Sequence, residues 1–382
     1  MRSGNDNVPV QNRLEPALFL YPLAHLAIEV YNSMLSVMWP LFIARFGLSF
    51  SALGMLTMVF RGAMTLPQLG FAPLADRIGS RRVAIGGLLC MATGMSLTGL
   101  SPSLGVLAVL LALAPLGSAA FHPAGIAHMS RCMPRYLASA VALFMIGGTL
   151  GMSLGPVFGA QIYGRFGLMA SPGFLPLGLI VALLMIVFIR ADRPAAQRRH
   201  AAARQAGTIP SAIFFVMAVV ITQAWVETGF QSYIATLVTG RGESLVQASQ
   251  ALFAYSATAA LGILLGGALA DRVPRWWVIV LSGQGMLLAS AMLGFSASLS
   301  HPVAVAMGQE LMPDRTSLAS ALTMGVSWVL GTVGVVLTGL LADHIGLQTS
   351  LLLNAALPTI GIVCTLAVRR LGQRTVVGEV AG

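Results

Sequence analysis

Long apolar segments separated by short polar loops dominate this sequence. A helix needs about 20 mostly apolar residues to cross a bilayer. The segments that qualify include 17–44, 52–75, 83–100, 104–128, 137–163, 172–189, 211–238, 250–270, 318–342 and 350–368. Only 9% of the 382 residues are charged and 57% are hydrophobic, whereas a water-soluble domain carries roughly 25% charged residues. The chain is therefore predicted to be an all-α membrane protein that crosses the bilayer many times.

The arginine residues are distributed unevenly between alternate loops. A net charge of +10 would indicate nucleic-acid binding in a water-soluble chain. If the N-terminus is cytoplasmic and the spans alternate, the outer loops hold only Arg45, Arg165 and Arg241, and Arg61 lies inside a span. The remaining basic residues, out of 22, then fall in inner segments, as the positive-inside rule requires. We expect a protein of the cell inner membrane with both termini cytoplasmic, the lipid bilayer as its surroundings and no nucleic-acid partner.

Residues 190–210 form the longest polar interruption and separate two similar halves. The segment APLADR at 72–77 returns as GALADR at 267–272, and FHPAGIAHMSRCMP at 121–134 returns as SHPVAVAMGQELMP at 300–313. Such repeats are typical of secondary transporters, whose halves move around a central site. The expected organisation is a cytoplasmic tail, an N-terminal six-helix bundle, a cytoplasmic linker, a C-terminal helix bundle and a second cytoplasmic tail, at 1–16, 17–190, 191–210, 211–370 and 371–382.

The second half is shorter than the first between its two repeated motifs. Arg275 and Pro313 are only 38 residues apart, and this interval must hold the ninth and tenth spans. Two full spans need about 40 residues before any turn is counted. Either both helices are short or one of them is partly lost. We therefore expect shortened helices 9 and 10, with helix 10 visibly reduced.

The loop around Asp76 carries a recognisable motif. It reads Ala72-x-Leu74-Ala75-Asp76-Arg77-x-Gly79-Ser80-Arg81-Arg82. This pattern resembles the loop between helices 2 and 3 of the major facilitator superfamily, although the family's usual Gly is Ala72 here. The resemblance implies two six-helix bundles related by a pseudo-twofold axis. It also implies a gate in which the Asp ties its helix end to a facing helix terminus and to nearby arginine, both favourable partners for a carboxylate.

The second copy of this loop keeps Gly267, Asp271 and Arg272 but has Pro274 where the family usually has Gly. A basic loop that only sets the orientation in the membrane is the alternative interpretation. The expected gating residues are Asp76, Arg77, Gly79, Arg81, Asp271 and Arg272.

A glycine-rich stretch, Gly151-x3-Gly155-Pro156-x2-Gly159, resembles the superfamily's antiporter signature on helix 5. Small residues at this spacing let helices approach closely, and the proline displaces a backbone hydrogen bond. The Gly expected nine residues before Gly151 is Ala142, and the second half has no matching Gly-Pro. The resemblance favours efflux, and tight helix packing without a transport meaning is the alternative.

A further combination resembles the fosmidomycin-resistance branch of this superfamily. It consists of Phe121-His122-Pro123, GGTLGMSLGP at 147–156, His25 four residues before Glu29, and Gln309-Glu310-Leu311-x-Pro313. An acidic residue commonly follows that His-Pro, and here the position holds Ala124. The role of that acid is therefore not carried over, and membership of the branch does not fix the substrate.

Three charged residues lie within predicted spans. Glu29 and Glu227 take near-equivalent positions in the two halves, 47 and 44 residues before the repeated Asp. A charge at mid-membrane costs about 2.5–3.5 kcal/mol on insertion scales, and a carboxyl group taken out of water binds a proton more readily. Arg61 lies about ten residues into helix 2, which is roughly 15 Å deep. It could pair with Glu29, hold an anionic substrate group, or form a purely structural ion pair.

His25 lies one helical turn before Glu29, and it could relay a proton or only hydrogen-bond the carboxylate. His122 precedes a helical proline, and we expect it to bond the carbonyl that the proline leaves free. No nucleophile constellation, phosphate loop, ATP-binding motif or convincing metal site is present, so the chain is not predicted to be an enzyme. A proton gradient, with no cofactor or metal, is expected to drive transport.

The sequence thus predicts a monomeric, proton-coupled exporter of a small amphipathic organic molecule. Glu29 is the expected proton site with His25 and Arg61 as partners, and Glu227 is its counterpart in the second bundle. His122 is assigned to the same proton and substrate pathway. Two alternatives remain open. One is a proton symporter that takes up an organic anion held by Arg61, and the other is a membrane scaffold with a degenerate second bundle that does not transport.

Overall fold

The structure is a computed structural model, and it describes residues 16–133, 137–190, 210–270, 272, 301–312, 318–319 and 321–366. All regular structure in these residues is helical. Seven of the described helices are long and apolar enough to cross a membrane. The prediction of an all-α, multi-pass membrane fold is therefore confirmed.

The described part of the N-terminal half contains seven α-helices and a short 3-10 helix. Helix α1 is central and apolar on all sides, which suits a helix enclosed by others. It packs against α6, α7, α5 and α4, while α4 also packs along α5. The elements are α1 Ala17–Phe46, α2 Phe50–Thr65, α3 Gln68–Ile78, α4 Ser80–Thr98, α5 Leu104–Cys132, α6 Leu137–Phe166, η1 Leu168–Phe174 and α7 Leu175–Phe188.

The described part of the C-terminal half is also helical. Its elements are α8 Ser211–Gly240, α9 Leu245–Ala270, α12 His301–Leu311, η4 Ala321–Val326, α14 Ser327–Ile345 and α15 Leu347–Asn354, with residues 357–366 helical as well. Helix α8 takes the central place that α1 has in the first half, and it packs against α14, α9 and α12. Of the interval expected to hold the ninth and tenth spans, residues 301–312 are described, and α12 is 11 residues long. The rest of that interval, Asp271 and the linker at 191–209 lie outside the described residues.

The predicted span 52–75 is not one continuous helix. It is divided into α2 and α3 at Leu66 and Pro67. Proline has no backbone N–H and its ring clashes with the preceding turn, so the helical hydrogen bonds stop there. A second proline, Pro73, lies inside α3. The sequence interpretation missed this break because the apolar pattern continues through it.

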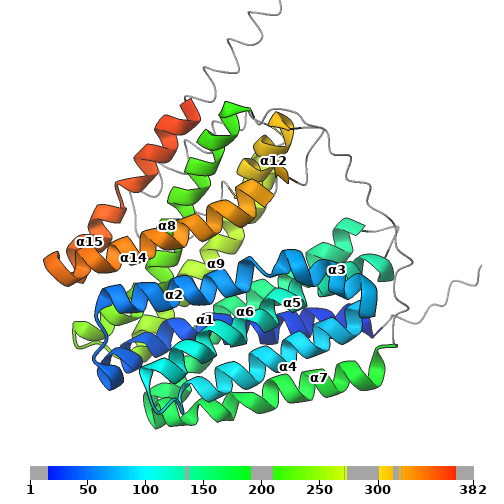
Figure 1. Cartoon of the computed structure of the whole chain (residues 1–382), viewed down its shortest axis with the longest axis horizontal. Coiled ribbons are helices and arrows are strands. Elements are labelled where there is room, and N and C mark those ends of the chain that lie inside the picture. The colour runs from blue at the N-terminus through cyan, green and yellow to red at the C-terminus, as the bar shows by residue number, and fades with distance from the viewer. Residues whose placement is uncertain are drawn as a thin grey trace, which may run out of the picture.

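The two halves meet along one part of their length only. Helix α2 packs against α14, α6 against α9, and α1 against α8, whereas α3 packs against α4 and α5 of its own half. Figure 1 shows the two sets of helices close together where α2 begins and α14 ends, and diverging toward α3 and α12. We call the first region the closed end of the molecule and the second the open end.

Candidate proton and substrate site

Three side chains from two helices converge in the centre of the N-terminal half. His122 Nε2 on α5 lies 3.1 Å from Glu29 Oε1 on α1. It also lies 3.1 Å from His25 Nε2 on α1. His25 Nε2 is 3.7 Å from the same Glu29 oxygen. The side chains of His25, Glu29 and His122 are only 4%, 12% and 21% exposed, so the cluster is nearly enclosed but reachable from the side of His122.

Local helix geometry explains how the cluster forms. His25 and Glu29 are four residues apart on α1 and therefore share one face of the helix. His122 is brought to that face by the packing of α5 on α1. The ring of His25 also stacks on Phe144 of α6, with ring centroids 4.1 Å apart. Three helices thus fix the geometry of the cluster.

Backbone carbonyls determine which imidazole nitrogens carry hydrogen. His25 Nδ1 lies 2.8 Å from the carbonyl oxygen of Phe144, and His122 Nδ1 lies 2.8 Å from that of Ser118. A carbonyl oxygen can only accept, so both Nδ1 atoms must donate. When a ring is neutral, its Nε2 then has a lone pair and no proton. The expectation that His122 bonds the carbonyl freed by Pro123 is wrong. That carbonyl belongs to Ala119, four residues before the proline, whereas His122 Nδ1 donates to the carbonyl of Ser118, four residues before the histidine itself.

This arrangement requires at least one additional proton. With both rings neutral and Glu29 ionised, the two Nε2 atoms and the carboxylate oxygen would face one another with lone pairs only. A 3.1 Å contact between two such atoms is a hydrogen-bond distance and needs a proton between them. A proton on His122 Nε2 satisfies the contacts with both neighbours and forms an ion pair with Glu29.

The same three atoms are the ones in the described residues that could reach a common cation. His25 Nε2, Glu29 Oε1 and His122 Nε2 all lie within 4.8 Å of one another. The sequence could not predict this convergence, because His122 is 93 residues from Glu29 and only the packing of α5 on α1 brings them together.

Glycines of α6 hold α1 in place beside the cluster. A Cβ atom added to Gly148 would collide with the ring of His25, and one added to Gly151 would meet the carbonyl oxygen of Leu26 and Cβ of Glu29. Gly155 and Gly159 likewise lie directly against α1. Helix α6 continues through Pro156. The antiporter-like motif is thus the surface against which the helix carrying His25 and Glu29 packs.

Arg61 belongs to a second polar group, which links the two halves. Its guanidinium donates to Gln231 Oε1 on α8 at 2.7 Å. Gln231 Nε2 donates in turn to Glu227 Oε1, one turn away, at 3.4 Å. Arg61 and Glu29 influence each other electrostatically but form no ion pair in this conformation. Of the alternatives considered for Arg61, a direct pair with Glu29 is not formed in this conformation, because the guanidinium is turned toward Gln231 of the C-terminal half.

The predicted gating loop lies at the open end. Asp76 and Arg77 are exposed, and Asp76 forms no hydrogen bond or ion pair with another described residue. Arg81 donates instead to the carbonyl oxygen of Ile186 at 2.5 Å. Gly79 adopts a positive φ of 98° between α3 and α4. Arg272 of the second copy is exposed.

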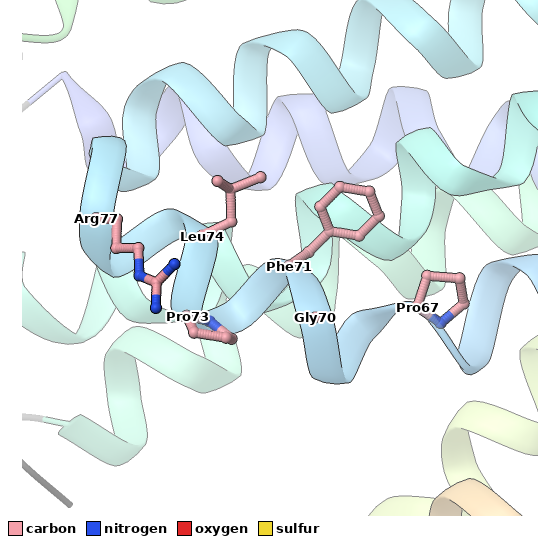
Figure 2. A pocket seen from close by; sticks show the side chains of 6 residues that line it. All are labelled: Pro67, Gly70, Phe71, Pro73, Leu74 and Arg77. Atoms are coloured by element: carbon pink, nitrogen blue, oxygen red, sulfur yellow. The ribbon is translucent and has the colours of Figure 1, made fainter.

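A cavity of about 410 Å³ lies along α3 beside this loop. Figure 2 shows Arg77 at one end of it and Pro67 at the other, with Phe71 and Leu74 between them. The loop is therefore open and its carboxylate has no hydrogen-bond or ion-pair partner in the described part of the chain, as expected for the side on which the halves have separated.

Comparison with known proteins agrees with this architecture. The family model of the Major Facilitator Superfamily matches residues 23–306. The chain belongs to this superfamily. It is 25% identical over 367 residues to the fosmidomycin resistance protein of Escherichia coli K12, covering 89% of this chain and 90% of that protein. It is also 25% identical over 382 residues to the MFS-type transporter YfnC of Bacillus subtilis, covering 92% of each.

Other members of the superfamily are similar over part of the chain or in fold. A multidrug resistance protein B homolog of Mycobacterium tuberculosis is 30% identical over 207 residues, covering 51% of this chain and 37% of that protein. A bacterial homolog of the human lysosomal transporter Spinster, solved in an inward-facing and occupied conformation, superposes with a TM-score of 0.78 at 16% identity and covers 92% of this chain and 96% of its own. The nucleoside transporter NupG gives a TM-score of 0.75 at 12% identity, over 92% of this chain and 99% of its own.

These findings confirm the resemblance on which the sequence interpretation rested. The superfamily consists of membrane transporters, so the chain is a multi-pass membrane transporter and not an enzyme. Its relatedness to the fosmidomycin-resistance branch extends over most of both halves. The non-transporting scaffold accordingly loses its support.

Proposed function

We propose that this superfamily member is a proton-coupled exporter of small amphipathic organic molecules in the cell inner membrane, acting as a monomer with both termini cytoplasmic. The observation that carries the proposal is the enclosed cluster of His25, Glu29 and His122, whose contacts need a proton. Relatives named for resistance to fosmidomycin and to multiple drugs support export rather than uptake.

The distribution of charge gives the proposed direction. Arg77, Arg82 and Arg190 are exposed around the open end, and positive residues are retained on the cytoplasmic side. The open end would then face the cytoplasm and the closed end the outside. In this state a substrate that enters between the halves would displace the proton from the cluster to the cytoplasm. After the closed end opens, the substrate would leave and an external proton would replace it.

Each side chain of the cluster has a defined part in this scheme. Glu29 provides the negative charge that holds the proton in a region where an unpaired charge is costly. His122 contacts both other members and is the most exposed of the three, so it would receive and pass on the proton. His25, anchored to Phe144, would fix the orientation of the cluster.

Proton movement in inside-out vesicles tests the proposal. Purified protein would be reconstituted with a pH-sensitive dye in the lumen, which is acidified first, and fosmidomycin and ethidium would be added outside as probes. Export by antiport predicts substrate accumulation with loss of luminal protons in wild type, and neither in Glu29→Gln. Glu243→Gln, an exposed carboxylate on the loop before α9, is the matched control and should behave as wild type.

Uptake of an organic anion is the second candidate. Arg61 is bonded to the neutral amide of Gln231 and not to a carboxylate, so an anionic substrate group could replace that amide. In the same vesicles with the proton gradient reversed, a symporter would carry protons and substrate into the lumen together. An antiporter would exchange one for the other. Identical behaviour of wild type and Glu29→Gln with every probe would reject proton coupling at this site.

A further inference from the structure

Two six-residue segments at opposite ends of the molecule share five of their six residues. LADRIG at 74–79 ends α3, and LADHIG at 341–346 ends α14. In both, the last residue is a glycine with positive φ that connects directly to the next helix, with φ and ψ of 98° and 132° at Gly79 and of 85° and 149° at Gly346. The two turns therefore have the same local structure. The first lies at the open end and the second at the closed end.

The two aspartates of these turns are in different states. Asp76 is exposed and has no hydrogen-bond partner among the described residues. Asp343 accepts two backbone hydrogen bonds from the other half of the molecule. Its Oδ1 lies 2.7 Å from the amide nitrogen of Phe50, and its Oδ2 lies 3.1 Å from that of Ser51.

The partner of Asp343 is the first turn of α2. The first amides of a helix have no acceptor within the helix, and the helix dipole favours a negative charge there. In α2, Ser49 Oγ accepts from the amide of Ala52 at 3.1 Å, and the two amides before it are satisfied by Asp343. The N-terminus of a helix in one half is thus capped by a carboxylate from the other half.

Neighbouring contacts make this a close junction. The Tyr233 hydroxyl of α8 lies 2.9 Å from the carbonyl oxygen of Phe50 and 3.0 Å from that of Val335 on α14. A Cβ atom added to Gly54 would lie 2.9 Å from this hydroxyl, and one added to Gly339 would collide with the Phe50 carbonyl. Three helices from both halves therefore meet at the amides that Asp343 caps.

We propose that Asp343 is the latch of the closed end: its carboxylate holds α2 of one half to α14 of the other in this conformation, and must release α2 before that end can open. The carboxylate is exposed, so water can replace the protein amides when the halves separate. Asp76 at the open end supports this reading: its carboxylate in the corresponding turn has no hydrogen-bond partner within the described ranges, whereas Asp343 is engaged where the halves touch. The latch controls the opening of the closed end, and its action does not depend on proton binding at Glu29.

Distance measurement between spin labels tests the latch directly in the full-length protein. Cys90, Cys132 and Cys364 are first replaced by serine. One label pair, at Met169 and Gln348, reports on the closed end, and a second pair, at Arg82 and Leu366, reports on the open end; all four are exposed. The compared variants are Asp343→Asn, Asp343→Ala and, as the matched control, Glu243→Gln.

The expected result is a larger population of long distances at the closed end. Loss of an exposed charge-assisted contact should raise that population about three- to tenfold in Asp343→Ala. Asp343→Asn should have a smaller effect because its amide oxygen still accepts one bond. Glu243→Gln should match wild type. A closed-end distribution in Asp343→Ala that equals wild type would overturn the proposal.

Misfolding can be separated from opening. A folded but opened variant should show shorter open-end distances together with longer closed-end distances, since the halves rock around a central site. Tyr233→Phe removes the adjacent hydroxyl but leaves Asp343 in place, so it should shift the populations in the same direction by less. Broadening of both pairs without this opposite movement would reject the latch.

Discussion

Glu29 and Glu227 lie on the central helices of the two halves, but their surroundings differ. Glu29 is contacted by two histidines of its own half. Glu227 is contacted by Gln231 of its own helix, which also accepts from Arg61 of the opposite half. The two carboxylates are buried to a similar degree, 9% and 5% exposed. Equivalent places in a repeated fold can therefore hold the proposed proton site in one half and a link between the halves in the other.

The largest effect is expected when the carboxylate of Glu29 is removed. Glu29→Gln removes the charge that holds the proton, and a hydrogen bond to a charged group is worth about 1.5–3 kcal/mol. Substrate-driven proton movement should fall about 10- to 100-fold, because each 1.4 kcal/mol is a factor of ten. Glu227→Gln keeps the contact with Gln231 and should reduce it much less. Equal losses in the two variants, measured with the luminal dye, would remove the distinction between the sites.

The histidines should differ in the same assay. His122→Gln breaks the 3.1 Å contacts with both Glu29 and His25, and it should lower proton movement about tenfold. His25→Gln breaks only one of these contacts, so its loss should be smaller. A reversed order would assign the proton to His25 and make His122 the positioning residue.

Glycine substitutions test whether α6 holds the cluster in position. In Gly148→Ala the new methyl group would press on the His25 ring, and overpacking typically costs about 1–3 kcal/mol. Gly164→Ala on the same helix is the control, since nothing lies within 4 Å of its added Cβ. Thermal unfolding of the purified proteins should show a lower Tm for the first variant only. The same Tm in both would mean that α1 and α6 can separate without cost.

Loss of the hydrogen bond between Arg61 and Gln231, which links the two halves, should affect substrate binding more than proton coupling. Arg61→Gln removes the 2.7 Å bond to Gln231, and the KM of the transported probe should change by about three- to tenfold. The number of protons moved for each substrate should stay as in wild type. If Arg61→Gln instead lost proton movement while its KM stayed unchanged, Arg61 would act together with Glu29 in proton coupling and not together with Glu227 in substrate binding.

The smallest effect is expected at Asp76, in the turn at the open end. Asp76→Asn removes no hydrogen bond or ion pair to the residues that the structure describes, and such surface changes usually stay within about 0.5 kcal/mol. The Tm of Asp76→Asn should therefore equal that of wild type under conditions that favour the conformation described here, in which the halves are separated at the open end. A clear destabilisation would show that Asp76 has a partner in the state that dominates in solution.

Much of the fold follows from composition and pattern alone. A helix in a membrane must form all of its backbone hydrogen bonds internally and present apolar side chains to the lipid. A run of about 20 apolar residues therefore predicts a span wherever it occurs. The repeated LADR and His-Pro motifs predicted two related bundles. The break at Pro67 was missed, since an apolar pattern does not reveal where a helical hydrogen bond is lost.

The site was predictable only in its parts. His25 and Glu29 share a helix face because four residues complete about one turn, so their proximity could be deduced. The contact of His122 with Glu29 could not, because it depends on the packing of α5 against α1. Arg61 faces Gln231 and not Glu29 for the same kind of reason. The repeat of LADRIG as LADHIG was a signal for Asp343 that the sequence interpretation did not use.

The sequence by itself determined that this chain crosses a membrane many times, is built from two similar halves and buries three charged side chains. These properties depend on the free energy of single segments in lipid, which each segment carries alone. Only the tertiary structure decided which buried groups meet, and which of two similar turns engages its aspartate. Those contacts depend on how separate helices pack, and the helix pairs involved differ between the two ends of the same molecule.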